Sequence, residues 1–478
     1  MACKIQTYVK LLLLSGMQRS VSSAPKGFGI LMIVGPSLVW ASEYIGSGEV
    51  ILATRTGAIL GIPILWAIIS GILLKFWIGM SGARYTVATG EGMIDMISRM
   101  PGPKNWGVWL VLVAQFVSAA ISIGSLATAA GIFMAELFSI DRVLSGWIVT
   151  ILAVLISWKG EFRILKIIMS ILVFIVILGV LNVALRVLPS ASDFLNGLIP
   201  SIPDVPGWAV EQGISENAWG EILPLIGWGA GGFASQVWYT YWVLGAGYGM
   251  AEKDNYGQAA DVGKLKAIDP EDAKKIKSWF RVVYTDASTG MIIGVIVTVS
   301  FLVAGAGILG PMEIAPDQES LASELSQIFQ SKWGQTGAVL FIAGGLAALI
   351  STQIGQLAGW PRLLADAFRI CIPRFARLRW TTQFRIFLLF FFVSNMTIVY
   401  QLGYKPVVLV QTGAILDGLL LTPLQALWVL AGLYIVQPKM FSKEVAKILK
   451  PRWYLAAGLI IAFLVFSYFC IYQIPKIF

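Results

Sequence analysis

Long apolar runs, separated by short polar segments, cover most of the chain. Most of these runs reach or exceed the roughly 20 residues that a helix needs to cross the hydrocarbon core of a bilayer. Several are longer than a bilayer requires, which indicates helices that tilt or protrude. The pattern predicts eleven membrane-spanning helices, at residues 29–57, 61–83, 106–138, 145–158, 162–188, 221–250, 282–308, 334–368, 383–400, 405–435 and 452–474.

Composition agrees with this pattern and excludes several classes of protein. The chain is 57% hydrophobic and only 13% charged, whereas about a quarter of the residues of a soluble domain are charged. The sequence therefore predicts an all-α polytopic membrane protein. It contains no histidine, and its three cysteines have no CxxC spacing, so neither a thiolate metal site nor a disulfide framework is expected. No Walker A, HExxH or GxSxG pattern occurs, which argues against an enzyme and predicts no cofactor.

Basic residues are confined to alternate loops, which predicts the topology. Residues 253–281 and 436–452 are rich in Lys and Arg, whereas residues 189–220 carry acidic charges only. By the positive-inside rule the N-terminus is cytoplasmic and, after eleven spans, the C-terminus is outside. We expect an integral protein of a bacterial-type plasma (inner) membrane, a monomer or weak oligomer surrounded by the lipid bilayer. Because the basic residues form no single patch, nucleic acid is not an expected partner.

The first span is interrupted at mid-depth. Gly46, Ser47 and Gly48 are poor helix formers in a row, and Glu43 and Glu49 place a carboxylate on either side of them. Unsatisfied backbone groups and carboxylates are tolerated at this depth only when protein encloses them or they line a polar cavity. The pattern favours a broken helix that offers polar groups to a ligand. A kinked helix with two satisfied glutamates is the simpler alternative.

The sixth span repeats this interruption and suggests an internal repeat. It reads LPLIGWGAGGFASQVWYTYW, and its glycines fall where those of the first span do. Because the sixth span lies five crossings after the first, an odd number, the second unit enters the membrane from the opposite face, as in transporters built from inverted repeats. Glycines used only for close helix packing are the alternative.

The expected organisation has five parts. They are a cytoplasmic segment (1–28), a first five-helix repeat (29–188), an extracytoplasmic loop (189–220), a second five-helix repeat (221–435), and a cytoplasmic loop with the eleventh span (436–478). Within the first part, Met17 is an alternative start, and residues 1–16 are expected to be dispensable.

Four stretches resemble the Nramp (natural resistance-associated macrophage protein) divalent metal transporters. GPSLVWASEYIGSGEV resembles the family's first span, GPGxxxSxGYIDPGN, and RYTVATGEGMIDM resembles the exit of its second span. SIGSLATAAGIFMAELF and LAALISTQIGQLAGWPRLLADAF are similar to runs in its spans 3 and 8. The resemblance covers most of spans 1 to 10. It implies a LeuT-like fold of two inverted five-helix units with broken helices 1 and 6, here with one extra span.

The departures from the family motifs lie at the residues that carry its chemistry. The metal-binding Asp of the first span falls on Gly46, and the Asn falls on Glu49. In span 6 the family's Met-Pro-His-Asn aligns with residues 234–237, Ala-Ser-Gln-Val, and the acidic pair of span 3 falls on Gly124 and Thr128. The resemblance thus implies a divergent Nramp-like member that lacks the usual metal-binding side chains. From the family's ligands it carries over only the backbone carbonyls of Gly46 and Gly231.

Other polar groups near mid-membrane are candidates to replace the missing ligands. Asp417 lies near the centre of span 10, and an intramembrane Asp is a functional hypothesis by default. Lys75 and Gln115 are its candidate partners, and a purely structural Asp417–Lys75 ion pair is the alternative. The expected substrate-binding residues are Glu43, Gly46, Glu49, Gly231, Gln236 and Asp417, of which all but Glu43 are expected metal ligands.

Two functions remain open from the sequence. The first is an Nramp-like transporter that moves a divalent cation by alternating access, with weak or no proton coupling. Oxygen ligands without His, Met or Cys suit a hard ion such as Mg²⁺ or Mn²⁺ better than Fe²⁺ or Zn²⁺. The second is a transporter of a small organic solute, an amine or amino acid, on the same fold.

Overall fold

The computed structural model describes residues 21–158, 174, 178–229, 231–251 and 256–477, and within them it contains helices and no strand. The longer helices are α5 (Leu65–Thr89), α7 (Trp106–Phe138), α8 (Arg142–Ser157), α12 (Trp219–Trp228), α13 (Phe233–Ala246), α15 (Pro270–Ala304), α16 (Leu321–Cys371), α17 (Trp380–Leu402), α18 (Pro406–Gly418), α19 (Thr422–Ala431) and α22 (Trp453–Tyr468). The shorter ones are α2 (Gly29–Ile33), α3 (Pro36–Tyr44), α4 (Thr54–Leu60), α6 (Met93–Ser98), α10 (Ala191–Asn196), α11 (Gly207–Glu211), α14 (Val262–Lys266), α20 (Gln437–Met440) and α21 (Lys443–Ile448).

Within the described residues, seven helical segments are long and apolar enough to cross a membrane. They are Ile62–Thr89, Trp106–Phe138, Pro270–Met312, Gln318–Cys371, Trp380–Leu402, Pro406–Met440 and Trp453–Lys476. The predicted spans 29–57 and 221–250 are divided into half-helices, and the predicted span 145–158 is the shorter apolar helix α8. Most of the predicted span 162–188, like residues 1–16 and Met17, lies outside the described residues. The all-helical membrane fold is therefore confirmed, and the count of eleven spans stays a prediction.

The two predicted breaks are present. The first span consists of α3, a non-helical step at Ile45 and Gly46, a π-helical turn (Gly48–Ala53) and α4. The sixth consists of α12, which ends at Trp228, and α13, which begins at Phe233. Glycine is required in the second break because Gly231 has a φ of +69°, which side chains rarely adopt.

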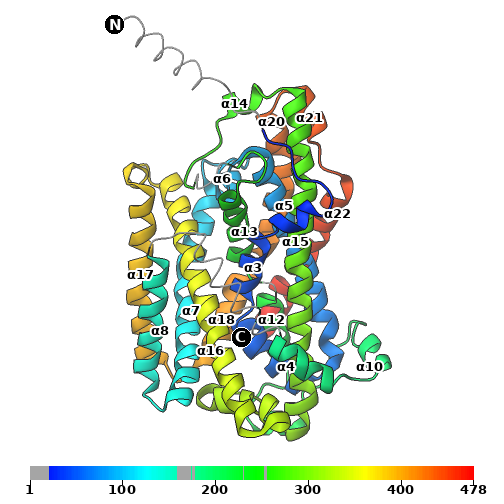
Figure 1. Ribbon diagram of the computed structural model, residues 1–478, viewed down its shortest axis with the longest axis vertical. Helices are drawn as coiled ribbons and strands as arrows, with labels where there is room; N and C mark the ends of the chain where they lie inside the picture. Colours follow the sequence, from blue (N-terminus) through cyan, green and yellow to red (C-terminus); the bar gives the residue numbers. More distant parts are fainter. Residues whose placement is uncertain (1–20, 159–173, 175–177, 230, 252–255, 478) are drawn as a thin grey trace, which may run out of the picture.

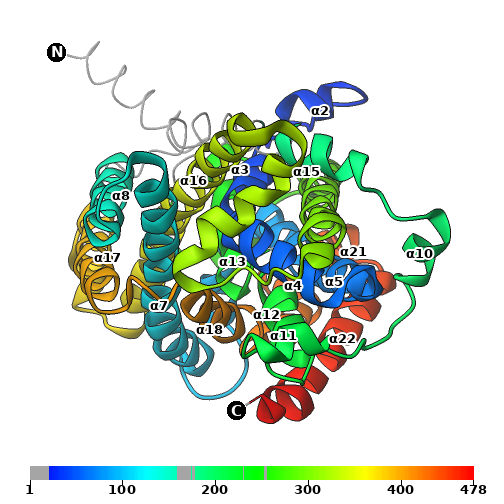
Figure 2. The ribbon, with the colours of Figure 1, turned by 90° about the horizontal axis from the view of Figure 1, so that it is seen from below.

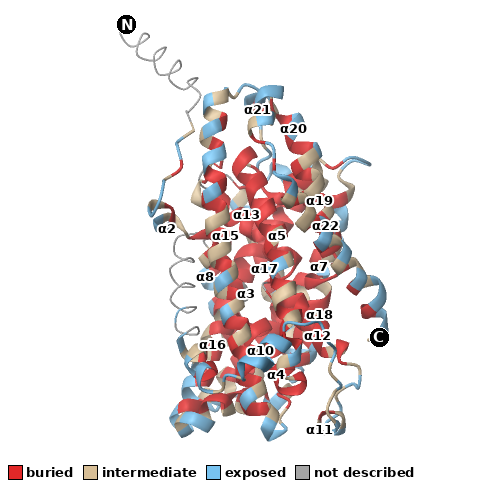
Figure 3. Cartoon of the chain, turned by 90° about the vertical axis from the view of Figure 1, so that its right-hand side faces the viewer, coloured by how far each residue is buried: buried red, intermediate tan, exposed pale blue. Residues whose placement is uncertain are grey.

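The broken helices occupy the middle of the molecule. Figures 1 and 2 show α3, α12, α13 and α18 enclosed between a group formed by α7, α8 and α17 on one side and α5, α15 and α22 on the other. α3 packs against α13, the π-helical turn packs against α12, and α16 crosses both α3 and α7. Buried residues are concentrated along this central region (Figure 3). The interrupted backbone is thus surrounded by protein rather than lipid, as its unsatisfied polar groups require.

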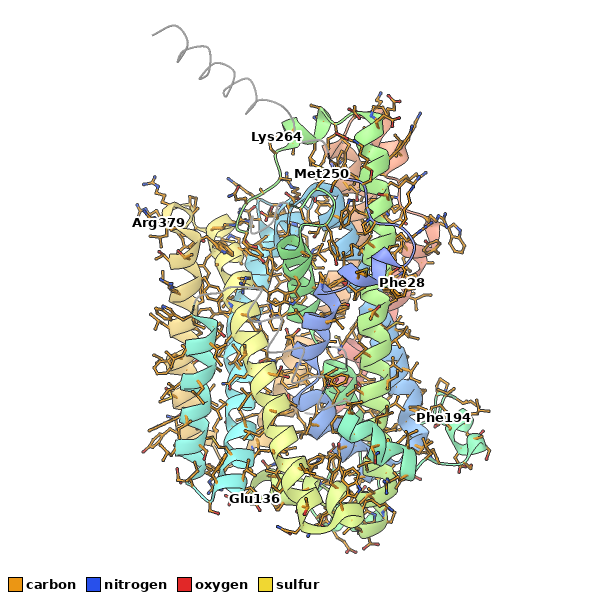
Figure 4. All side chains as sticks on the ribbon, viewed as in Figure 1. Phe28, Glu136, Phe194, Met250, Lys264 and Arg379 are labelled. Atoms are coloured by element: carbon orange, nitrogen blue, oxygen red, sulfur yellow. The ribbon has the colours of Figure 1, made fainter. Side chains whose placement is uncertain are left out.

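Charged segments separate toward the two ends of the molecule. Lys264 and Arg379, both from basic loops, lie at the same end, whereas Glu136 and Phe194 lie toward the other (Figure 4). This separation agrees with the alternation of loop charges in the sequence. The orientation of the ends relative to a cell stays a prediction.

Candidate functional site

The two helix breaks and the neighbouring helices surround a small cavity of about 10 Å³, which has room for about one water molecule. Its lining residues come from the first span, the sixth span, α16 and α18. They are Glu43, Ser47, Gly48, Trp228, Gly231, Gly232, Ser235, Trp238, Thr352, Gln356, Trp360 and Asp417. The cavity therefore brings together polar oxygens and nitrogens, three indole rings and two carboxylates. These groups come from four separate segments of the chain.

Glu43 is the carboxylate that α3 contributes, near the end of that half-helix. The Ser235 hydroxyl, at the start of α13, donates to Glu43 Oε2 at 2.9 Å. The indole Nε1 of Trp40 donates in turn to Ser235 Oγ at 2.9 Å. This chain of hydrogen bonds links the inner half of the first span to the second half of the sixth, and it holds Glu43 at the cavity wall.

Asp417 is the carboxylate that α18 contributes, and it is 2% exposed. Gln115 Nε2 donates to Asp417 Oδ1 at 3.1 Å, and the backbone N–H of Ala234 donates to the same oxygen at 3.2 Å. Both hydrogen bonds go to Oδ1, while Oδ2 lies beside Gly232 at the cavity. Trp360 Nε1 fixes Gln115 by donating to its Oε1 at 2.8 Å. Of the two candidate partners, Gln115 is the one that contacts Asp417.

Lys75 does not pair with Asp417. No ion pair between them occurs in the part of the chain that the structure describes. The Lys75 ammonium instead donates to backbone carbonyls at the end of α12 and in the break that follows, including Gly231 at 2.8 Å. The Gly231 carbonyl, an expected metal ligand, therefore already accepts a hydrogen bond from a cationic side chain.

Glu49 lies outside the cavity lining and stabilises the break. Its Oε2 accepts from the backbone N–H of Gly46 at 3.0 Å, and its Oε1 accepts from the Thr298 hydroxyl at 3.3 Å. The Gly46 carbonyl accepts from the N–H of Val50 at 2.8 Å. Gln236 is fully buried, with its Nε2 3.5 Å from the Gly232 carbonyl. Of the six predicted residues the structure brings Glu43, Gly231 and Asp417 to the cavity, and places Gly46, Glu49 and Gln236 around it.

The position of Gly46 explains why an acidic side chain is absent there. A Cβ built on Gly46 would lie 2.7 Å from the Cβ of Thr352 on α16. The Thr352 hydroxyl donates to the carbonyl of Ile45 at 3.2 Å. Thr352 therefore fills the space that a side chain at position 46 would need, and it satisfies one of the carbonyls that the break exposes.

One important residue was missed from the sequence. Asp286 on α15 is fully buried and accepts from the backbone N–H groups of Gly35 (2.8 Å) and Ser37 (3.0 Å), and from the Tyr239 hydroxyl (2.8 Å). It caps the N-terminal end of α3, where a helix leaves N–H groups without partners. The signal was available, since Asp286 is an acidic residue within the predicted span 282–308.

Ion pairs close the structure on both sides of the cavity. On α4, Arg55 contacts Glu221 of α12 (3.1 Å), with both side chains 6% exposed, and its Nη1 donates to the Pro316 carbonyl at 2.6 Å. On the side where the basic loops lie, Arg369 of α16 contacts Asp95 at 2.6 Å, and the same guanidinium contacts Asp366 at 2.7 Å. The first cluster links α4 to α12, and the second links α16 to α6.

A family model described as natural resistance-associated macrophage protein-like (Nramp) matches residues 37–210 of the chain. The divalent metal cation transporter MntH of Chromohalobacter salexigens is 24% identical over 348 residues, which cover 71% of this chain and 72% of that protein. MntH of Mycobacterium leprae is 26% identical over 171 residues, which cover 35% of this chain and 40% of that protein. The aligned region thus spans less than half the length of the second relative.

Solved structures agree over nearly the whole chain. The crystal structure of the Eremococcus coleocola manganese transporter, in complex with an aromatic bis-isothiourea substituted compound, has a TM-score of 0.68 at 15% identity. The match covers 95% of this chain and 90% of that one. MHP1, a nucleobase-cation-symport-1 family transporter, has a TM-score of 0.52 at 13% identity, covering 91% of each chain. At such identities the matches show the fold. The chain therefore has the LeuT-like fold of these transporters, and the resemblance to the Nramp family that its sequence motifs indicated is confirmed.

Proposed function

We propose that this chain is a secondary transporter that carries a divalent cation through the cavity between its two broken helices by alternating access. The observation that carries the proposal is the charge gathered around that cavity. Glu43 and Asp417 line it, Glu49 lies behind the first break, and Lys75 lies behind the second. With all of these groups ionised, as beside a bound cation, three carboxylates and one ammonium would carry a formal charge of −2. One divalent cation would neutralise it, whereas an uncompensated buried charge is costly.

The named relatives give independent support to a metal substrate. The similar curated proteins from Chromohalobacter salexigens and Mycobacterium leprae are described as divalent metal cation transporters, and the similar solved structure from Eremococcus coleocola is described as a manganese transporter. Because this chain departs from the Nramp motifs at the ligand positions, the residues of its own cavity determine which ion it carries.

The chemistry of the lining favours a hard ion. Its polar side-chain groups are two carboxylates, three hydroxyls, one amide and three indole N–H groups, without Met, Cys or His. Oxygen ligands of this kind suit Mg²⁺ or Mn²⁺ better than Fe²⁺ or Zn²⁺. Only two carboxylates reach the cavity, and within the described residues no cluster of three or more His, Cys, Asp or Glu side chains forms. The ion would therefore keep part of its water shell, as Mg²⁺ commonly does.

The absence of histidine and the residues at two positions of span 3 argue for weak or absent proton coupling. The chain has no histidine. The positions that resemble the family's acidic pair in span 3 are Gly124 and Thr128, and the Thr128 hydroxyl donates to the Gly124 carbonyl at 2.9 Å. Neither residue can take up a proton, so a relay along span 3 would have no titratable group at either position.

A small organic ammonium is a second candidate, because Trp228, Trp238 and Trp360 all line the cavity. Indole faces attract organic cations. The cavity of about 10 Å³ has room for about one water molecule, so it would have to widen to admit even a small amine. Thermal-shift measurements of the purified protein with Mg²⁺, Mn²⁺ and methylamine or larger amines would separate the two candidates, because a ligand that binds the native state raises its melting temperature.

The direct test is uptake of Mg²⁺ or Mn²⁺ into proteoliposomes by the wild-type protein and two variants. Asp417→Asn and Glu43→Gln should each abolish uptake, because each removes a cavity carboxylate while keeping the shape of the side chain. Glu136→Gln is the matched control, since Glu136 is exposed at the end of α7. Normal cation uptake by both cavity variants would overturn the proposal. Binding of an amine but of neither metal would favour the second candidate.

A further inference from the structure

The Lys75 ammonium occupies a cage of backbone carbonyls at the break in the sixth span. Lys75 lies on α5 and is fully buried. Its Nζ is 2.6 Å from the carbonyl oxygen of Ile226, 2.5 Å from that of Gly227, 3.3 Å from that of Gly229 and 2.8 Å from that of Gly231. All four oxygens belong to the end of α12 or to the residues that follow it.

These contacts favour a charged side chain. A carbonyl oxygen can only accept hydrogen bonds, and an ammonium has three N–H groups to donate, whereas a neutral amine has two and a lone pair. The carbonyls at the C-terminal end of a helix also carry partial negative charge and lack partners within the helix. In broken transporter helices, such exposed carbonyls are the groups that coordinate transported or coupling cations.

Among the described residues, no carboxylate forms an ion pair with this ammonium. The ion pairs found among the described residues do not include Lys75. The charge of the ammonium is therefore stabilised by peptide dipoles. It adds one positive charge near the cavity without forming an ion pair with the cavity carboxylates, which remain available to bind a transported ion.

The end of α12 packs closely against α18. A Cβ at Gly227 would collide with the backbone of Ala414, and a Cβ at Gly418 would collide with the backbone of Gly227. On another side, α5 brings Lys75 to the free carbonyls of the break.

We propose that Lys75 is a tethered cation. It fills the carbonyl cage of the α12 break, leaves the carboxylate side of the cavity to the transported ion, and thereby sets the charge of that ion at +2. The cage assignment stands on the contacts alone, and the effect on substrate charge rests on the proposed function. Lys75 is in this sense a specificity-determining residue, which takes a position where a free cation would otherwise bind.

Chemical rescue tests the cage. In a choline chloride background the Lys75→Ala variant should melt at a lower temperature than the wild type, because its carbonyls lose their donor. Ammonium or methylammonium ions, at tens of millimolar, should restore much of the loss in the variant and leave the wild type unchanged. Lys264→Ala, on the exposed face of α14, is the matched control and should show neither effect. Absence of rescue, or equal rescue by tetramethylammonium, which cannot donate hydrogen bonds, would overturn the tethered cation.

Trivalent competition tests the effect on substrate charge. Lys75→Gln keeps two N–H donors for the carbonyls but removes the charge. This variant can therefore be used even if Lys75→Ala does not fold. Without the ammonium the formal charge around the cavity becomes −3, so La³⁺ should displace bound Mn²⁺ at least tenfold more effectively in the variant than in the wild type. An unchanged ratio would refute the role of Lys75 in charge selection. If ammonium rescues Lys75→Ala but the wild-type protein binds no divalent ion, Lys75 is a tethered cation and the proposed function is wrong.

Discussion

Replacement of Asp286 by Asn should strongly destabilise the fold, because this carboxylate fixes the start of the broken first span. Its Oδ1 accepts from Gly35 N–H, and its Oδ2 accepts from both Ser37 N–H and the Tyr239 hydroxyl. The three donors belong to two different spans, and Asp286 belongs to a third span. The carboxylate therefore links three spans. An Asn side chain offers one oxygen and one NH₂ group, so at least one donor would face another donor.

The magnitude follows from these contacts. One buried donor without an acceptor costs about 1–3 kcal/mol, and the remaining hydrogen bonds lose the charge that strengthened them. We therefore expect Asp286→Asn to lower the free energy of unfolding by about 2–4 kcal/mol. Reversible unfolding in mixed detergent micelles, followed by tryptophan fluorescence, would measure it.

A control on the same helix sharpens the measurement. Asp269 caps the exposed N-terminus of α15 by accepting from the N–H of Asp272 at 2.7 Å. Asn is as good as Asp at such a position, so Asp269→Asn should cost less than about 0.5 kcal/mol. If Asp286→Asn costs no more than this control, the carboxylate does not hold the start of α3, and the reasoning is refuted.

Three further predictions follow from the described contacts. Arg55→Met should leave the buried carboxylate of Glu221 without its cation and lower the free energy of unfolding by about 3–5 kcal/mol. It should also increase the labelling, from the side of α4, of a cysteine introduced into the cavity lining. Unchanged stability and labelling would contradict the view that Arg55 helps to close this side. Gly46→Asp should reduce the melting temperature because it collides with Thr352, and adding Thr352→Gly should restore it; a fully stable single variant would show that the space is not filled. Cysteines introduced at residues 189–220 should react with impermeant reagents only from outside the cell, and reaction only from inside would invert the topology.

Local sequence features predicted the elements of the site better than their contacts. The two breaks follow from glycines and serine within apolar runs, since these residues weaken a helix wherever they occur. Asp417 was recognised because a carboxylate within an apolar span requires a partner, and Gln115 was one of the two partners named. The same rule applied to residues 282–308 would have found Asp286, so that omission lay in the application of the rule.

The contacts that distinguish the two carboxylates of the first span required the folded chain. Both Glu43 and Glu49 flank the break in sequence, and nothing local separates their roles. In the structure Glu43 lines the cavity, whereas Glu49 turns back to the Gly46 N–H and to Thr298 on α15. The direction of each side chain depends on which helix packs beside it, and helical periodicity does not contain that information.

The sequence by itself determined that the chain is a helical membrane protein with two interrupted spans and few charges at mid-depth. These properties follow from hydropathy and helix propensity, which act over a few turns of one helix. Only the tertiary structure decided that Lys75 meets the carbonyls of Ile226, Gly227, Gly229 and Gly231 rather than Asp417. That contact joins residues more than 150 positions apart, and it exists because the packing of α5 against the α12 break brings a buried ammonium to the carbonyls that the interrupted helix leaves without partners.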